Sequence, residues 1–321
     1  EANRQEAESL FREALGVDTR FSPAYAGLAS LQVTQGKLAE AEENLKRAAE
    51  LAGPRSPRSV QYAVFKLRLG DLEEAEKILQ GVVTAAPDYI PALVRLAEVQ
   101  VERKEFAEAG ERLKTVLRQD PTHPEALIVS SRLALEQGDF ARALSQVQIL
   151  LRMYPQSAEA HVEAARVHLK RNDEEDAFAS LNMAVLYNPD YRSAVVMLAE
   201  INVRRGNVAE AVGALRVFLV KQPTAVDALS MLAEGYRLQG EWSLAAETLQ
   251  RIESLAPGLE DTALRKAVLL ADQQKFEEAK TVLQAVLDRS PLFVPALDKL
   301  VEVEDAIGGS SVVAETRANR A

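Results

Sequence analysis

Small residues recur along the chain with a fixed spacing of 34 residues. One column of alanines has a member in every period, and a column of prolines keeps the same spacing further along each period. The alanines are Ala7, Ala41, Ala75, Ala109, Ala143, Ala177, Ala211, Ala245 and Ala279, and the prolines are Pro87, Pro121, Pro155, Pro189, Pro223, Pro257 and Pro291. No insertion or deletion interrupts this register, so the chain is predicted to be an array of equivalent units.

Each unit is predicted to contain two helices, helix A followed by helix B. In the first complete unit, whose position 1 is Ser22, helix A runs from about Pro23 to Gln35 and helix B from about Leu38 to Leu51. A proline in the first turn of helix A loses no helical hydrogen bond. Gly36, at position 15, suits a tight turn that needs a positive φ angle. At the equivalent position three units carry Lys104, Asn172 and Gln274.

Two columns of small residues are predicted to meet where helices A and B of one unit cross. The first is the alanine column at position 20, and the second lies at position 8 of helix A. The second column reads Ala29, Ala63, Ala97, Ser131, Ala165, Ala199, Ala233 and Ala267. Small side chains let the two backbones approach closely, and leucines at position 24 then fill the interior, so a larger residue in either column should overpack the crossing.

These columns resemble the pattern of the tetratricopeptide repeat family, with glycine at the turn and alanine, alanine and proline through helix B. The resemblance covers nearly the whole chain and implies an all-α fold, a right-handed α-solenoid or superhelix of antiparallel helix pairs. The predicted divisions are 1–21 (helix B of an incomplete leading repeat), the full repeats 22–55, 56–89, 90–123, 124–157, 158–191, 192–225, 226–259 and 260–293, and 294–321 (helix A of a ninth repeat and a short C-terminal tail). Because the array begins and stops partway through a repeat, we expect a segment of a longer protein.

Composition narrows the classes of partner. The formal net charge of −10 argues against binding to nucleic acid, and no uninterrupted apolar stretch reaches the roughly 18 residues of a membrane span. The absence of cysteine excludes disulfides and thiol nucleophiles, and it fits a bacterial protein of the cytoplasm, periplasm or cell envelope. The start of the chain does not have the basic and then apolar pattern of a signal segment.

No catalytic, cofactor or metal site is predicted. The histidines are His123, His161 and His168. His161 and His168 lie seven residues apart on one helix A, about 10 Å along its axis, too far to bind one ion together. No glycine-rich phosphate loop and no Ser/His/Asp arrangement is present.

The resemblance implies that helix A lines a concave groove where ligands bind, and two aliphatic stripes follow that face at positions 5 and 12. Charged residues lie between the stripes at positions 9 and 13. The predicted partner-binding residues are Val60, Leu67, Val94, Glu98, Val101, Ile128, Arg132, Leu135, Val162, Arg166, Leu169, Lys170, Val196, Glu200, Val203 and Arg204. Two interpretations stay open: an exposed apolar groove with central cations, or packing between adjacent helices A beside a solvated charged face.

The function predicted from the sequence is a non-enzymatic scaffold or adaptor that binds a protein or peptide with an apolar or amphipathic segment. Bacterial envelope, secretion or exopolysaccharide assembly is suggested by resemblance alone. One alternative is a targeting or substrate-recruiting module of a larger enzyme, such as a transferase, whose catalytic domain lies elsewhere. Another is a chaperone for a hydrophobic subunit. Position 5 is aliphatic, and position 6 has no asparagine ladder, which argues against the carboxylate clamp of co-chaperones and the repeats of nucleotide-sugar glycosyltransferases.

Overall fold

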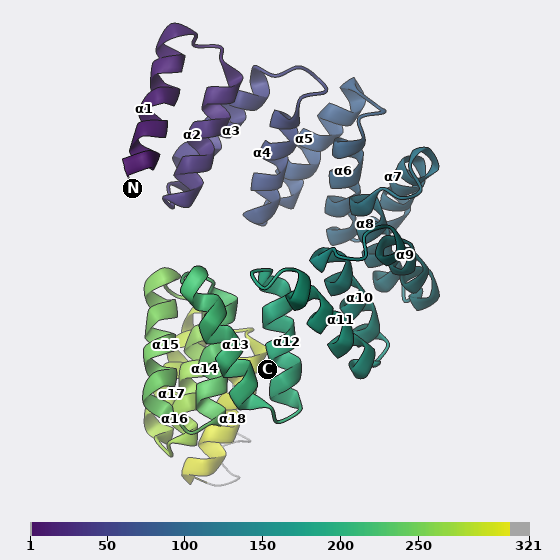
Figure 1. Ribbon diagram of the computed structural model, residues 1–321. Coiled ribbons are helices and arrows are strands. Elements are labelled where there is room, and N and C mark those ends of the chain that lie inside the picture. The colour runs from purple at the N-terminus through teal and green to yellow at the C-terminus, as the bar shows by residue number, and fades with distance from the viewer. Residues whose placement is uncertain (1, 309–321) are drawn as a thin grey trace. The chain divides into compact units, whose positions relative to one another are not determined.

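The computed structural model describes residues 2–308 and consists, over that range, of eighteen α-helices without a β-strand (Figure 1). The chain divides into two compact units, residues 1–155 and 156–321. The described part of the first unit contains α1 (Ala2–Val17), α2 (Ser22–Thr34), α3 (Leu38–Glu50), α4 (Pro57–Arg68), α5 (Leu72–Ala85), α6 (Ile90–Glu102), α7 (Phe106–Gln119), α8 (Pro124–Glu136) and α9 (Phe140–Met153). Even-numbered helices are helix A of a repeat and odd-numbered helices are helix B.

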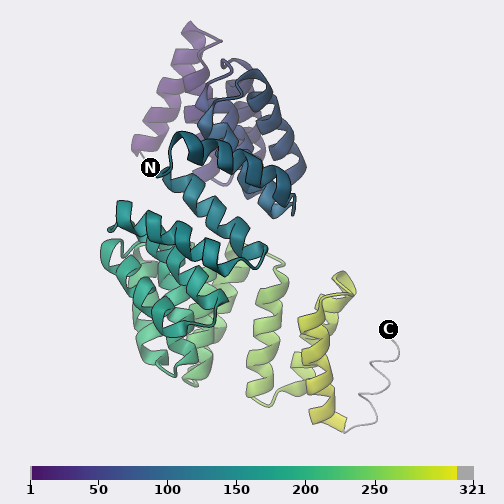
Figure 2. The ribbon, with the colours of Figure 1, turned by 90° about the vertical axis from the view of Figure 1, so that its right-hand side faces the viewer.

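The described part of the second unit continues the same alternation. It contains α10 (Ala158–Lys170), α11 (Glu174–Tyr187), α12 (Arg192–Arg204), α13 (Val208–Lys221), α14 (Val226–Leu238), α15 (Trp242–Leu255), α16 (Glu260–Asp272), α17 (Phe276–Arg289) and α18 (Val294–Gly308). Consecutive helices pack side by side within each unit, as α16, α17 and α18 do in Figure 2. The predicted all-α fold of stacked helix pairs is confirmed. The short tail predicted after α18 lies outside the described residues.

The two columns of small residues are buried as predicted. Every alanine at position 20, from Ala41 to Ala279, is at most 1% exposed. Position 8 is equally enclosed, with Ala165 at 0% and its largest exposure, at Ala233, only 3%. The leucines at position 24, such as Leu181, fill the space beside them. The crossing of helices A and B therefore depends on these short side chains.

The turn between helices A and B adopts the left-handed conformation in every complete repeat. Five turns use glycine, with φ between 73° and 80°, and the other three place Lys104, Asn172 and Gln274 at φ of 62–63°. The β-carbon makes this region costly for every residue except glycine, but the short side chain of asparagine can offset the cost by a local hydrogen bond, which the longer side chains of lysine and glutamine do not do routinely. Lys104 and Gln274 are therefore strained positions.

Replacing Lys104 with glycine is expected to raise the free energy of unfolding by about 0.5–1 kcal/mol, because the relieved strain exceeds the extra chain entropy of glycine. Urea denaturation followed by circular dichroism measures the change. The matched control is Lys37→Gly, since Lys37 is an exposed lysine beside a turn but has φ of −83°. If both substitutions had the same effect, backbone strain at Lys104 would be ruled out.

No helix among the described residues combines the length and apolar character that crossing a membrane requires.

Candidate functional site

Helices A of successive repeats lie beside one another and form one face in each unit, the A-helix face. In the first unit α4, α6 and α8 are neighbours, and in the second unit α10, α12, α14, α16 and α18 follow one another. This adjacency brings residues 34 positions apart in the sequence close together. The predicted partner-binding residues all lie on these helices.

The two aliphatic stripes are built into the packing between these helices. Four of their members, Val94, Val101, Ile128 and Val162, are only 2–8% exposed. The other six are half-buried: Val60, Leu67, Leu135, Leu169, Val196 and Val203. Of the two interpretations left open by the sequence, packing between adjacent helices therefore describes the four buried side chains. The half-buried six still offer part of their surface to a ligand.

The charged members of the predicted site fall into paired and unpaired groups. In the first unit Glu98 lies 2.6 Å from the Nη1 atom of Arg95 and 3.5 Å from that of Arg132. In the second unit, Arg204 lies 3.7 Å from Glu174. The exposed side chains of Arg166, Lys170 and Glu200 form no ion pair within residues 2–308.

Ion pairs also link successive helices A of the second unit. Arg265 on α16 pairs with Asp261 at 2.7 Å and approaches Glu234 on α14 at 4.0 Å. Glu234 accepts a hydrogen bond of 2.7 Å from Arg237, which also pairs with Asp272. The network ties α14 to α16 across the A-helix face, where it also supplies charge of both signs.

A cleft of about 590 Å³ opens beside this network. Its lining comes from the first half of α12, α14 and α16 and from the turn before α14, with Val196, Val226 and Met231 as apolar members. Two oppositely charged pairs flank them: Arg192 with Asp227 at 3.4 Å, and Arg265 with Asp261. The full lining is Arg192, Val196, Thr224, Val226, Asp227, Ser230, Met231, Asp261 and Arg265.

The network should make stability sensitive to acid. Hydrogen bonding by Arg237 lowers the pKa of Glu234 below its ordinary value. A carboxyl with a lowered folded-state pKa stabilises the fold above its unfolded pKa, about 4.3, and this stability is lost as the pH falls through the folded value. We expect Glu234→Gln to lose less stability on acidification than the unmodified chain in urea titrations at successive pH values. Glu200→Gln, which removes an exposed carboxyl, should lose as much stability on acidification as the unmodified chain does. Equal slopes of the free energy of unfolding against pH for all three proteins would contradict the assignment of this acid sensitivity to Glu234.

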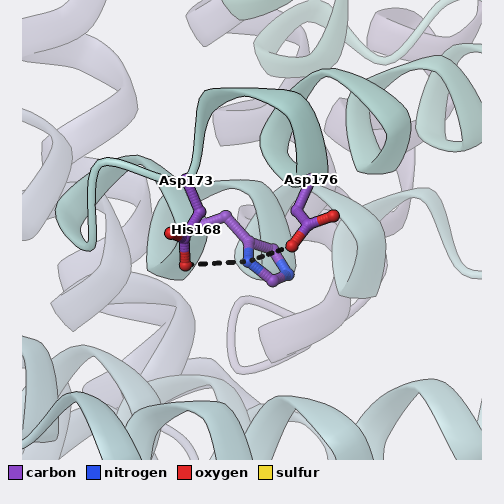
Figure 3. Close-up of side chains that lie close together, drawn as sticks. All are labelled: His168, Asp173 and Asp176. Carbon is purple, nitrogen blue, oxygen red and sulfur yellow. Dashed lines mark ion pairs between the residues drawn. The ribbon is translucent and has the colours of Figure 1, made fainter.

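One histidine lies beside two carboxylates that the sequence analysis did not connect with it (Figure 3). The Nδ1 atom of His168 is 4.0 Å from Asp173 and 3.8 Å from Asp176, too far for direct hydrogen bonds. The three groups could approach one metal ion. However, Arg171 already pairs with Asp173 at 3.2 Å and compensates its charge, which leaves the largely exposed Asp176 as the single carboxylate available to a cation.

Family models identify the repeat. Three models described as tetratricopeptide repeat match the chain: one at residues 66–133, a second at 26–90, 129–194 and 196–260, and a third at 261–292. The second alone covers more than half of the sequence. The chain belongs to the tetratricopeptide repeat family. Tetratricopeptide repeats are protein-interaction scaffolds in general, and their fold is typically non-catalytic.

Solved tetratricopeptide repeat structures share the fold at low identity. A tetratricopeptide repeat protein from Parabacteroides merdae matches with a TM-score of 0.54 and 16% identity, over 78% of this chain and 100% of its own. PilW, a type IV pilus biogenesis factor, matches with a TM-score of 0.57 and 18% identity, over 67% of this chain and 98% of its own.

A human protein gives a similar match over a longer part of the chain. Human IFIT1, solved as a dimer with PPP-AAAA, has a TM-score of 0.55 and 16% identity, over 98% of this chain and 84% of its own. At such identities these likenesses establish the fold alone. No curated protein is similar enough to this chain to count as a relative.

Sequence reasoning missed most of the lining of the cleft. It concentrated on positions 5, 9, 12 and 13, whereas Asp227 and Asp261 stand at position 2, and Met231 and Arg265 at position 6. A signal was present, because position 2 is proline in the first three complete repeats and acidic or serine in the next five. Acidic residues at a helix start also favour the helix dipole, so this change alone does not indicate a binding site.

Proposed function

We propose that this tetratricopeptide repeat array is a non-enzymatic scaffold that holds an extended, amphipathic segment of a partner protein against the A-helix face of its second unit. The observation that carries the proposal is the cleft of about 590 Å³ between the first halves of α12, α14 and α16. It combines an apolar lining with charged side chains of both signs, the composition expected where side chains orient a bound segment.

The chemistry of the cleft favours a peptide with an apolar side chain flanked by charges. The apolar side chain would pack against Val196 and Met231. Charges of the segment would exchange with the pairs Arg192–Asp227 and Arg265–Asp261. The first pair is exposed to water and so costs little to rearrange, and in the second pair Asp261 is exposed while Arg265 is half-buried. A peptide of this kind would gain orientation from the charged pairs and affinity from the buried apolar contact.

Unpaired cations extend the same face on α10. Arg166 and Lys170 lie four residues apart, therefore on one side of the helix, and both are exposed. They suit an acidic residue of the bound segment. The half-buried Leu169 beside them supplies an apolar edge.

The scaffold is proposed to serve bacterial envelope, secretion or exopolysaccharide assembly. The likeness to PilW supports only the fold of such a scaffold. A targeting module of a larger enzyme would show a catalytic domain in the full-length reading frame. A chaperone for a hydrophobic subunit would depend mainly on the half-buried aliphatic residues, such as Leu135 and Leu169.

Charge reversal on the A-helix face tests the proposal. The double variant Arg166→Glu/Lys170→Glu and the double variant Arg192→Glu/Arg265→Glu are immobilised and used to capture partners from the native source, identified by mass spectrometry. We expect each variant to retain full helicity and to lose the partner captured by the unmodified chain, by about tenfold or more in recovered amount.

The matched control is Arg152→Glu/Arg216→Glu, which makes the same change of charge at exposed positions on α9 and α13. This control should capture the partner as well as the unmodified chain does. If all three double variants captured the same amount of partner, the proposal that the A-helix face is the binding surface would be wrong.

A further inference from the structure

A second cleft lies between α15, α16 and α17, and it shares no lining residue with the cleft of the A-helix face. Its volume is about 720 Å³, within the range of small-molecule sites. One side of α16 lines it from Thr262 to Leu270, which corresponds to about 12 Å along the helix axis, and Leu259 and Gln273 extend the lining beyond the two ends of the helix. The cleft is therefore elongated.

The lining is mainly aliphatic. Its buried members are Leu249, Leu269 and Val286, together with the side chain of Thr262. The half-buried Leu270 and Val282 extend the apolar surface toward the opening. Such a surface favours a hydrocarbon chain over a peptide, whose backbone would need a hydrogen-bonding partner at nearly every residue.

Thr262 is the one polar side chain among the buried lining residues. It is 4% exposed, and its Oγ1 atom has no hydrogen-bond partner in the described structure. Four other helical threonines, by contrast, donate to a carbonyl oxygen four residues earlier: Thr84, Thr115, Thr248 and Thr281. A buried hydroxyl without a partner is costly, so this one indicates a group that the protein itself does not supply.

The repeat pattern shows that alanine is usual at this position and that only Thr262 and Arg58 depart from it. Thr262 occupies position 3, where seven other repeats carry an alanine of 0% exposure. These alanines are Ala24, Ala92, Ala126, Ala160, Ala194, Ala228 and Ala296. The packing of helix A therefore does not require a hydroxyl here.

The end of the cleft near Thr262 has an unusual turn and a cation. Gly258 has φ of 79°, and no other turn from helix B to helix A contains a positive φ within residues 2–308. A β-carbon on Gly258 would lie 3.5 Å from the Nη1 atom of Arg289. The guanidinium thus lies beside this turn, near the N-terminus of α16, whose first turn also carries Glu260 and Asp261.

Positive charge prevails in the lining. Lys266, Lys275 and Arg289 are exposed and form no ion pair within the described residues. The single acidic member, Glu253, already accepts a hydrogen bond of 3.0 Å from the N–H of Gly258. An apolar channel with surplus cations is complementary to an aliphatic anion.

We propose that this cleft binds a linear aliphatic carboxylate of medium chain length. The carboxylate lies at the end formed by Gly258, Thr262 and Arg289 and accepts hydrogen bonds from the Thr262 hydroxyl and the Arg289 guanidinium. The hydrocarbon chain extends along α16 over Leu269, Leu270 and their neighbours. This site is independent of the peptide-binding face proposed above, because the two clefts use different residues.

Isothermal titration calorimetry of the 321-residue chain with decanoate, below its micellar concentration, tests the proposal. We expect decanoate to bind, and decyltrimethylammonium and acetate to bind at least about tenfold more weakly. Arg289→Gln should weaken decanoate binding by about tenfold, whereas Arg216→Gln, on α13, should leave it unchanged. A cation that bound as well as the carboxylate would overturn the proposal.

Two further variants separate binding from folding. Thr262→Ala restores the residue usual at this position, so it should keep or raise thermal stability while weakening decanoate binding several-fold. Ala285→Phe fills the cleft from an exposed lining position, and Ala179→Phe adds the same ring at an exposed position outside it. Only the first should abolish binding; undiminished binding by Ala285→Phe, or binding of a leucine-ending peptide without binding of decanoate, would overturn the assignment.

Discussion

Replacing Leu181 with alanine is expected to lower the free energy of unfolding by about 2–5 kcal/mol. Leu181 is 0% exposed and belongs to one cluster of buried side chains contributed by α10, α11 and α12. Several of its neighbours are alanines, including Ala165, Ala177 and Ala184, whose side chains cannot move to fill a cavity. Because the surroundings cannot collapse, the cost should fall toward the upper part of this range.

Urea denaturation and amide hydrogen exchange together measure this effect. In a repeat array each unit contacts mainly its neighbours, so we expect the loss of protection to concentrate in α10, α11 and α12. The control is Leu186→Ala on the same helix, where the side chain is 69% exposed and the cost should be below about 0.5 kcal/mol. Similar costs for both leucines, or a loss of protection spread evenly along the chain, would be inconsistent with this packing.

Most of the fold could be predicted from the sequence because its determinants are local and repeated. A small residue at position 8 and an alanine at position 20 are needed wherever helices A and B cross, so the same constraint appears in every repeat. The conformation of the turn between helices A and B was harder to predict. Lys104 and Gln274 adopt positive φ although their side chains disfavour it, because the neighbouring helices fix the geometry of the turn.

The candidate site was only partly predictable. Helical periodicity places Val94 and Leu169 on one face, but it does not say how closely the next helix A approaches. Val94 is 2% exposed, whereas Leu169 is half-buried, and this difference arises from packing between repeats. The pairing of Glu98 with Arg132 likewise joins residues 34 positions apart and depends on that same packing.

Both clefts have lining residues at positions that vary between repeats. Asp227 and Asp261 replace the prolines of earlier repeats in the first cleft. Thr262 replaces a buried alanine in the second, next to the atypical turn at Gly258. The repeat pattern predicts the shared packing, so residues that vary within a column, such as these, could not be assigned a place in either cleft from the sequence.

The opposite substitution at the same crossing tests the small-residue columns directly. Replacing Ala177 with leucine is expected to lower the free energy of unfolding by about 1–3 kcal/mol, because the added carbons must displace a neighbouring backbone. Ala177 is 0% exposed and lies in the same buried cluster as Ala165 on helix α10. Leucine is a good helix former, so the loss would not come from helix propensity.

Ala179→Leu is the matched control, since Ala179 lies two residues further along α11 and is exposed. It should change stability by less than about 0.5 kcal/mol. Thermal unfolding followed by circular dichroism compares the two variants, which have the same amino-acid composition. If Ala177→Leu were as stable as Ala179→Leu, the close approach of α10 and α11 would not depend on the short side chain, and the physical basis for the 34-residue alanine column would be wrong.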